Sequence, residues 1–197
     1  VMAVWLFGVG EDPAVVAARR RKTVVELELL GLEIERVREE RLGLAALQAE
    51  LTDEHLTENG IELQILQKLN QLGPLVLALP QTSIRDRGLA SLATCPDLVG
   101  VSLLGTSITD TGLQGLLELP RLQMVAVERT AVSDAGMTHL ARCRQLRQLY
   151  LGSTRVTDLG LEQLSGLKQL EALKLSGTEV GDRGLVALAD LPRLKYL

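Results

Sequence analysis

The chain has 197 residues, of which 46% are hydrophobic and 23% are charged, so it can bury a core and is not expected to be disordered. Its net charge of −4 and its four aromatic side chains argue against a nucleic-acid-binding protein, which needs a basic surface and a stacking platform. Two cysteines and two histidines are too few for a disulfide scaffold or a zinc module, and no cofactor or metal is expected.

Residues 1–12 begin with the apolar run VMAVWLFGVG, which is about half as long as a membrane-spanning helix. A basic run, residues 19–22, follows it closely. Two interpretations stay open. In one, the residues preceding Glu11 are the end of a membrane anchor, and the basic run places the rest of the chain in the cytoplasm. In the other, this apolar segment packs on the chain's own fold or in a dimer. A cytoplasmic location is favoured in either case.

Residues 13–60 have the composition of a helical region. Pro13 suits the first turn of a helix, and spacings of four and three residues separate a mostly aliphatic series from Thr23 to Leu51. The pattern predicts one long helix over 13–51, in which Gly31 and Gly43 allow a kink or a break. It is either an ordinary amphipathic helix or a coiled coil that makes the chain a homo-oligomer. Thr52 or Asp53 is expected to cap the next helix, and Asn59-Gly60 to end it.

Residues 61–197 contain a pattern that recurs every 24 residues. Its polar and glycine positions are Thr82, Thr106, Thr130, Thr154 and Thr178, then Asp86, Asp110, Asp134, Asp158 and Asp182, then Gly88, Gly112, Gly136, Gly160 and Gly184. A strand motif L-x-x-V/L-x-L/V completes each unit, as at 146–151. Residues 61–81 are an imperfect first unit, because Leu75 precedes Leu98 by only 23 residues.

These columns have direct physical meanings. Alternation along each strand places Val125, Leu149 and Leu173 inside, and each Thr or Ser before an Asp is expected to cap a short helix. No unit covers its own apolar face, so neighbouring units must stack into a solenoid with one parallel sheet. This is the signature of leucine-rich repeats. The last residues, 194–197, lie within a predicted strand, so a C-terminal cap is expected to be lacking.

Two segments carry a closer family resemblance. GTSITDTGL at 105–113 resembles the cysteine-containing, ribonuclease-inhibitor-like repeats, and GLASLA at 88–93 resembles the GALA-type repeats of bacterial effectors. The resemblance implies an α/β solenoid, a right-handed horseshoe, preceded here by the long helix. It also implies a protein-recognition scaffold, often one that presents substrates to a ubiquitin ligase. Threonine occupies the position that is often asparagine or cysteine in such repeats.

Few residues are candidates for chemistry. Cys95 and Cys143 lie in an apolar column and are expected to be core thiols too far apart for a disulfide. His55 and His139 have no partners at metal-ligand spacing and are expected on the surface. The aspartates come once per unit, which suits helix capping and not calcium binding. A set of cations is expected to complement the helix C-termini or to meet an acidic partner, namely Arg121, Arg142, Arg144, Lys168 and Arg193.

The concave face of the sheet is the expected binding surface. Its best candidates for partner contacts are Tyr150, Met124, Gln148, Lys174, Glu128, Ser102 and Tyr196. The sequence therefore predicts a non-enzymatic scaffold that binds a protein partner on this face. The alternatives are an assembly subunit that oligomerises or is anchored through its N-terminal helix, and a substrate-recognition adaptor for ubiquitin-type modification.

Overall fold

The computed structural model describes residues 13–39 and 44–197. The α-helices and strands follow one another as α1 (Pro13–Glu28), β1 (Glu33–Glu39), β2 (Leu44–Glu50), β3 (Leu56–Thr57), β4 (Gly60–Ile61), α2 (Leu63–Leu69), β5 (Leu75–Ala78), α3 (Asp86–Leu89), β6 (Leu98–Ser102), β7 (Met124–Ala126), α4 (Asp134–Leu140), β8 (Gln148–Tyr150), α5 (Asp158–Gln163), β9 (Ala172–Lys174) and α6 (Asp182–Ala187). Short 3-10 helices accompany them at Asp53–His55, Ala90–Thr94, Gly112–Glu118, Leu164–Gly166 and Leu188–Asp190.

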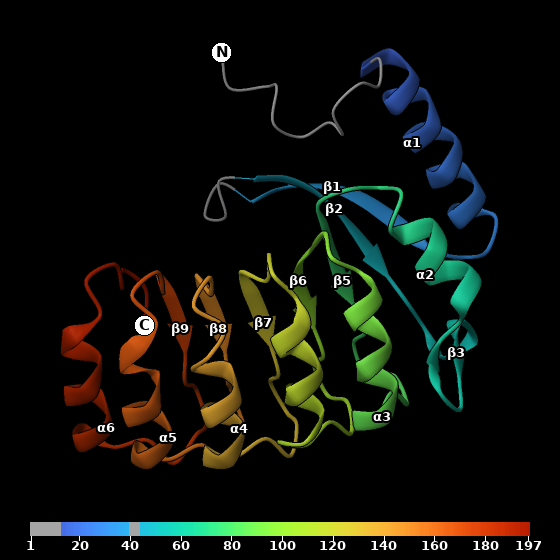
Figure 1. Cartoon of the computed structure of the whole chain (residues 1–197). Coiled ribbons are helices and arrows are strands. Elements are labelled where there is room, and N and C mark those ends of the chain that lie inside the picture. The colour runs from blue at the N-terminus through green and yellow to red at the C-terminus, as the bar shows by residue number, and fades with distance from the viewer. Residues whose placement is uncertain (1–12, 40–43) are drawn as a thin grey trace.

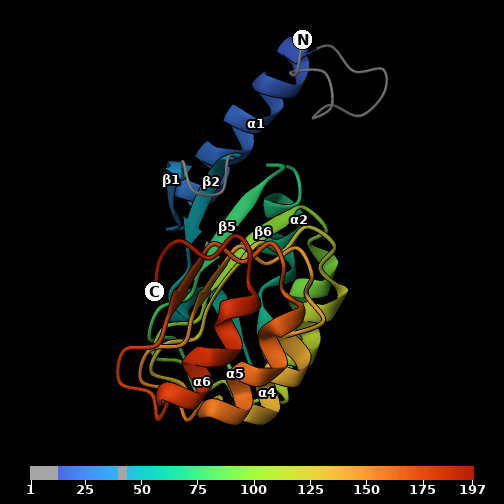
Figure 2. The same cartoon turned by 90° about the vertical axis from the view of Figure 1, so that its left-hand side faces the viewer.

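Seven of these strands form one sheet in the order β1-β2-β5-β6-β7-β8-β9 (Figure 1). Strands β5 to β9 are parallel, and each is followed by a helical segment that returns along the same side of the sheet. Figure 2 shows α4, α5 and α6 together on that side, with the strands on the other. One apolar cluster fills the space between the two layers from Leu27 to Leu191. The predicted α/β solenoid is the architecture that the chain adopts.

The register of the sheet matches the repeat columns. Gly100 pairs with Met124, Met124 with Gln148, and Gln148 with Ala172. The predicted inward residues Val125 and Leu149 are fully buried between the layers. At the imperfect first unit, Leu75 pairs with Leu98 but Val76 pairs with Gly100, so the one-residue difference is absorbed as an irregularity at Val99.

The predicted long helix is wrong beyond Glu28. The chain turns at Leu29–Leu32, where Gly31 has a φ of +88°, a conformation that favours glycine. Residues of β1 and β2 then form an antiparallel hairpin, and β2 pairs in parallel with β5. The strand state is favoured because β5 offers an unpaired edge, which satisfies the backbone groups of β2. A coiled coil over 13–51 is therefore excluded.

The helix predicted between Thr52 and Gly60, after the β1–β2 hairpin, is a single turn in the structure. Thr52 is the N-cap of a single 3-10 turn, Asp53–His55. Asn59 lies in the turn of the small β3–β4 hairpin, and Gly60 is the first residue of β4, paired with Thr57. The predictions for residues 1–12, including membrane attachment before Glu11, lie outside the described residues. Within the part of the chain that the structure describes, no helix has the length and hydrophobicity needed to cross a membrane.

Candidate binding face

The repeats are fixed to one another by an aspartate in each turn. Asp110 Oδ1 accepts a hydrogen bond from the Ser133 backbone N–H at 2.7 Å, and its Oδ2 accepts one from the Ser133 hydroxyl at 2.7 Å. Asp134 makes the same two contacts with Thr157. The hydroxyls of Ser133 and Thr157 cap α4 and α5 as predicted, but the aspartates do more than cap helices. They set the spacing between neighbouring turns.

The glycine column makes room for these aspartates. A Cβ atom at Gly136 would lie 2.5 Å from Asp110 Oδ1, and one at Gly160 would lie 2.4 Å from Asp134 Oδ1. Real Cβ atoms do not approach an oxygen so closely, so the aspartate of one repeat requires the glycine of the next. The threonine column is buried too, and Thr130 Oγ1 donates to the Val127 carbonyl at 2.7 Å. The recurring polar residues thus have structural partners.

The first row of the concave face contains Gly100, Met124, Gln148, Ala172 and Tyr196. A Cβ atom at Gly100 would lie 3.0 Å from Met124 Cε and 3.2 Å from Val76 Cγ2, so these two side chains close over the glycine. Met124 packs with Val76 and Val99 in a small apolar cluster separate from the main core. Sequence reasoning missed Val76 and Val99 on this face, although the 23-residue spacing at Leu75 marked the irregularity that places them there.

The second row contains Ala78, Ser102, Ala126, Tyr150 and Lys174. Tyr150 lies along the strand toward Gln148, and its hydroxyl donates to Gln148 Oε1 at 2.9 Å. Gln148 is 1% exposed, and Tyr150 is half-buried. The tyrosine expected to contact a partner is therefore held to the sheet through a buried amide, and Gln148 itself offers almost no surface.

Lys174 and Glu128 lie beside this tyrosine. The Lys174 ammonium is 2.7 Å from Glu128 Oε1, and the resulting hydrogen bond raises the pKa of Lys174 above its ordinary value. Glu128 is the more enclosed partner of the pair. Ser102 is half-buried, and Tyr196 is 50% exposed beside Ala172. Tyr150, Gln148, Lys174 and Glu128 thus form one continuous group, with Met124 next to Gln148 and with Ser102 and Tyr196 farther along the face.

The remaining candidates have structural surroundings. Burial raises the pKa of the Cys95 thiol and raises that of Cys143 to about 11. Cys95 is a buried core thiol as expected, whereas Cys143 is partly buried at the edge of the core. Arg144 donates to the Gly166 carbonyl and Lys168 to the Asp190 carbonyl, both at the ends of helical segments. These contacts support the predicted helix-terminus role for Arg144 and Lys168, whereas Arg121 forms an ion pair with Asp97 at 2.6 Å. Over the described ranges, no group of acidic, histidine or cysteine side chains could hold a metal ion.

His55 was expected on the surface and is instead buried. Its Nδ1 accepts a hydrogen bond from the Thr52 backbone N–H at 3.0 Å, so its Nε2 carries the proton that is donated to the Leu30 carbonyl at 3.0 Å. The ring therefore joins the turn after α1 to the Asp53–His55 turn. The sequence showed no sign of this role, because both partners are backbone groups.

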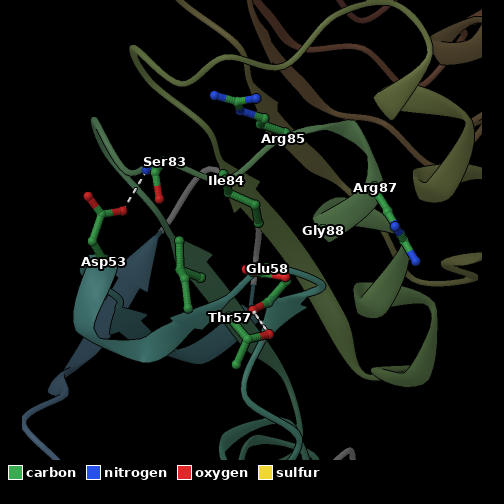
Figure 3. Close-up of a pocket in the computed structure, with 10 residues that line it drawn as sticks. Asp53, Thr57, Glu58, Ser83, Ile84, Arg85, Arg87 and Gly88 are labelled. Carbon is green, nitrogen blue, oxygen red and sulfur yellow. Dashed lines mark hydrogen bonds between the residues drawn. The ribbon is translucent and has the colours of Figure 1, made fainter.

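A pocket of about 720 Å³ lies where this segment meets the first repeat (Figure 3). Asp53 borders it and accepts a hydrogen bond from the Ser83 backbone N–H at 2.6 Å, which lowers the pKa of Asp53. Arg85 and Arg87 also border the pocket, but they point away from each other and do not converge on one position. The Asp53–Ser83 hydrogen bond at the edge of the pocket is thus a structural contact. The described residues that line the pocket form no cluster of charged or polar groups that would identify a ligand.

Comparison with known proteins agrees with this geometry. A family model described as Leucine Rich repeat matches residues 168–189. An internalin (inlF) from Listeria monocytogenes superposes with a TM-score of 0.56 and 24% identity, over 70% of this chain and 38% of the internalin, so the chain spans well under half of that protein. An internalin C2 from the same species gives a TM-score of 0.53 and 23% identity, over 94% of this chain and 82% of that one. A search of curated protein sequences finds no significant match. The chain therefore contains a leucine-rich repeat and has the leucine-rich-repeat fold.

Proposed function

We propose that the chain is a non-enzymatic scaffold that binds a protein partner on the concave face, and that its repeats are of the ribonuclease-inhibitor-like, GALA-like type. Leucine-rich-repeat proteins typically serve protein interaction, and solenoids present extended concave surfaces for it. The observation that carries the proposal is the continuous group formed by Tyr150, Gln148, Lys174 and Glu128 on β8, β9 and the turn after β7. No recurring polar residue of the repeat remains for catalysis.

The composition of this group indicates how a partner would bind. Interface energy concentrates in a few aromatic and well-packed residues, and Tyr150 already has its ring fixed on the sheet by the bond to Gln148. A fixed side chain loses little conformational entropy when a partner covers it. Glu128 and Lys174 neutralise each other, so the partner meets a surface with little net charge. Binding should therefore depend only weakly on salt concentration.

A peptide selection tests this proposal. A phage-displayed random peptide library is selected on the immobilised chain, and the affinity of each enriched peptide is measured by fluorescence polarisation. Tyr150→Ala should weaken binding by more than 1 kcal/mol, which is about fivefold in Kd. The matched control is Leu159→Ala, an exposed apolar position on α5 at the helical side of the repeats. Equal affinities for Tyr150→Ala and Leu159→Ala, with both variants folded by circular dichroism, would exclude the concave face.

A further inference from the structure

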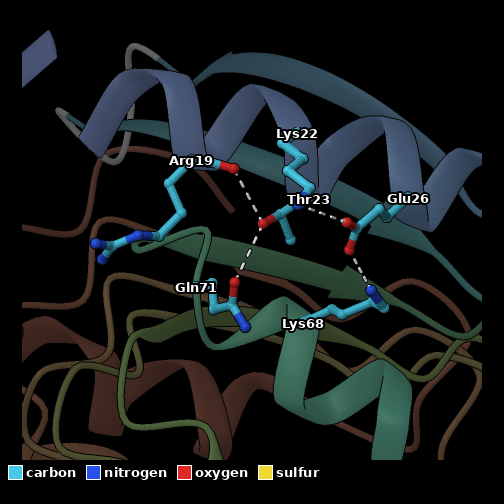
Figure 4. Close-up of polar contacts among 6 residues, drawn as sticks. All are labelled: Arg19, Lys22, Thr23, Glu26, Lys68 and Gln71. Atoms are coloured by element: carbon cyan, nitrogen blue, oxygen red, sulfur yellow. Dashed lines mark hydrogen bonds and ion pairs between the residues drawn. The ribbon is translucent and has the colours of Figure 1, made fainter. Parts of the chain in front are cut away.

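Helix α1 is attached to the rest of the fold by one of its faces (Figure 4). Thr23 is buried, and its hydroxyl lies 3.2 Å from Gln71 Oε1 as well as 3.1 Å from the Arg19 carbonyl. Leu27 is fully buried, and Glu26 forms an ion pair with Lys68 of α2. These contacts fix the rotation of α1 about its own axis, so its other face has a defined direction.

That other face is exposed and carries three large apolar side chains around a central lysine. We define the outer face of α1 as Val15, Ala18, Lys22, Val25 and Leu29. Val15 and Val25 are each 53% exposed and Leu29 is 82% exposed. The Leu29 N–H donates to the Val25 carbonyl at 3.0 Å, so the helical turn continues to Leu29. The successive spacings of three, four, three and four residues are those of a helix that packs along another helix.

The position of α1 leaves this face accessible to another molecule. Both views show α1 extending beyond the sheet and the repeat helices (Figures 1 and 2), and α2 packs against one side of it. Within the described residues α1 keeps Val15, Val25 and Leu29 exposed, and such a row of apolar side chains is a frequent mark of association.

We infer that the outer face of α1 binds the same face of a second copy of the chain, with the two helices antiparallel. Charge decides the orientation. A parallel pair would place Lys22 against Lys22 of the other copy. An antiparallel pair places Lys22 beside Val25 and Leu29 beside Ala18, and it brings Arg21 of each copy to Glu28 of the other. Arg21 and Glu28 are both exposed and of opposite charge, so this orientation pairs them, whereas the parallel one would place Arg21 beside Glu26, which already pairs with Lys68.

The contact is short, because α1 contributes only five outer-face positions. Coiled-coil pairs of this length are weak, so the dimer should form reversibly and depend on concentration. A dimer formed through α1 would also join two concave faces in one molecule, which strengthens binding to any partner that has two matching sites. This inference does not depend on what the concave face binds.

Light scattering over a concentration series of the full chain tests the association. The mean mass should rise toward that of a dimer, and Val25→Glu with Leu29→Glu should return it to that of a monomer. Val186→Glu is the matched control, because Val186 is an exposed valine on α6 far from α1. Arg21→Glu should weaken the dimer at least several-fold, and adding Glu28→Arg to it should restore the wild-type affinity.

Cysteine crosslinking tests the orientation. Two single variants, Lys22→Cys and Val25→Cys, are mixed and oxidised. An antiparallel pair gives the mixed disulfide between them, whereas a disulfide between two Val25→Cys chains would overturn the proposed orientation. The inference is also overturned by a monomer at every concentration, or by a dimer that persists after Val25→Glu with Leu29→Glu. A monomer whose unfolding free energy falls sharply in that double variant would show that the chain's own residues cover this face.

Discussion

The carboxylate of Glu128 and the ammonium of Lys174 meet at 2.7 Å although their strands, β7 and β9, are separated by β8. The contact is made across Gly152, which follows β8. A Cβ atom there would lie 3.5 Å from Glu128 Cγ, an ordinary contact distance, so the side chain of Glu128 lies close over Gly152 as it crosses the middle strand. The pair therefore links alternate repeats on the face that we propose as the binding surface.

Removing the carboxylate should lower the pKa of Lys174. Its hydrogen bond with Glu128 raises that pKa, so Glu128→Gln should return it toward the ordinary value for lysine. Because the folded-state pKa is raised, the pair's stabilisation is fully present at neutral pH and is lost as the pH rises through the folded-state pKa. The measurement is an NMR titration of ¹³C-methylated lysines. Glu162→Gln, which removes an exposed pair with Arg183, should leave the Lys174 resonance unchanged.

Replacing Asp134 should separate two repeats energetically. Asp134→Ala removes the two carboxylate oxygens that accept hydrogen bonds from the Thr157 N–H and the Thr157 hydroxyl, and it leaves the N–H without a partner. Hydrogen bonds to a charged group each contribute about 1.5–3 kcal/mol, so the unfolding free energy should fall by at least about 2 kcal/mol. Urea denaturation measures it. Asp182→Ala, at the equivalent but exposed position of α6, should cost much less, and equal losses would refute the inter-repeat role.

A methyl group at Gly136 should destabilise the chain in spite of the higher helix propensity of alanine. The added Cβ would lie 2.5 Å from Asp110 Oδ1 and 2.9 Å from Leu113 Cδ1. Overpacking of this kind costs about 1–3 kcal/mol, which exceeds the gain of about 1 kcal/mol in propensity.

Two comparisons locate the cause of that loss. In Gly181→Ala the nearest atom to the new Cβ is an Asp158 oxygen at 3.6 Å, so the unfolding free energy should fall only through the poorer N-cap that alanine gives α6. In a chain that already carries Asp110→Ala, the additional cost of Gly136→Ala should shrink. Thermal unfolding of the four variants measures both effects, and strictly additive costs would show that Asp110 is not the obstacle.

His55→Phe should loosen the N-terminal segment. Phenylalanine fills the buried space but leaves the Leu30 carbonyl and the Thr52 N–H without their partner. Thr52 and Leu30 are exposed residues, so each lost hydrogen bond costs about 0.5–1.5 kcal/mol, and we expect the unfolding free energy to fall by about 1–3 kcal/mol. Hydrogen exchange should accelerate mainly in α1 and the turn after it. Uniform acceleration over all repeats would instead indicate a general packing defect.

The architecture of the repeats could be predicted from the sequence, because each recurring position fills the same structural role in every repeat. The threonines, aspartates and glycines all recur at 24-residue spacing, and the row of Gly100, Met124 and Gln148 followed from alternation alone. Strand alternation did not predict that Tyr150 lies toward Gln148 or that Glu128 extends across Gly152 to Lys174. Both side-chain directions depend on how neighbouring residues pack, and a single sequence does not show that packing.

The N-terminal region shows where sequence reasoning ended. By itself the sequence determined an α/β leucine-rich-repeat solenoid over its larger part, because stacking identical units is the one way in which each can bury its apolar face. Only the tertiary structure decided the state of residues 33–39 and 44–50, for which the sequence pattern predicted a helix. They became β1 and β2 because β5 presents an edge with unpaired backbone groups, and β2 satisfies those groups by pairing with it. A helix over the same residues would leave the edge of β5 unpaired.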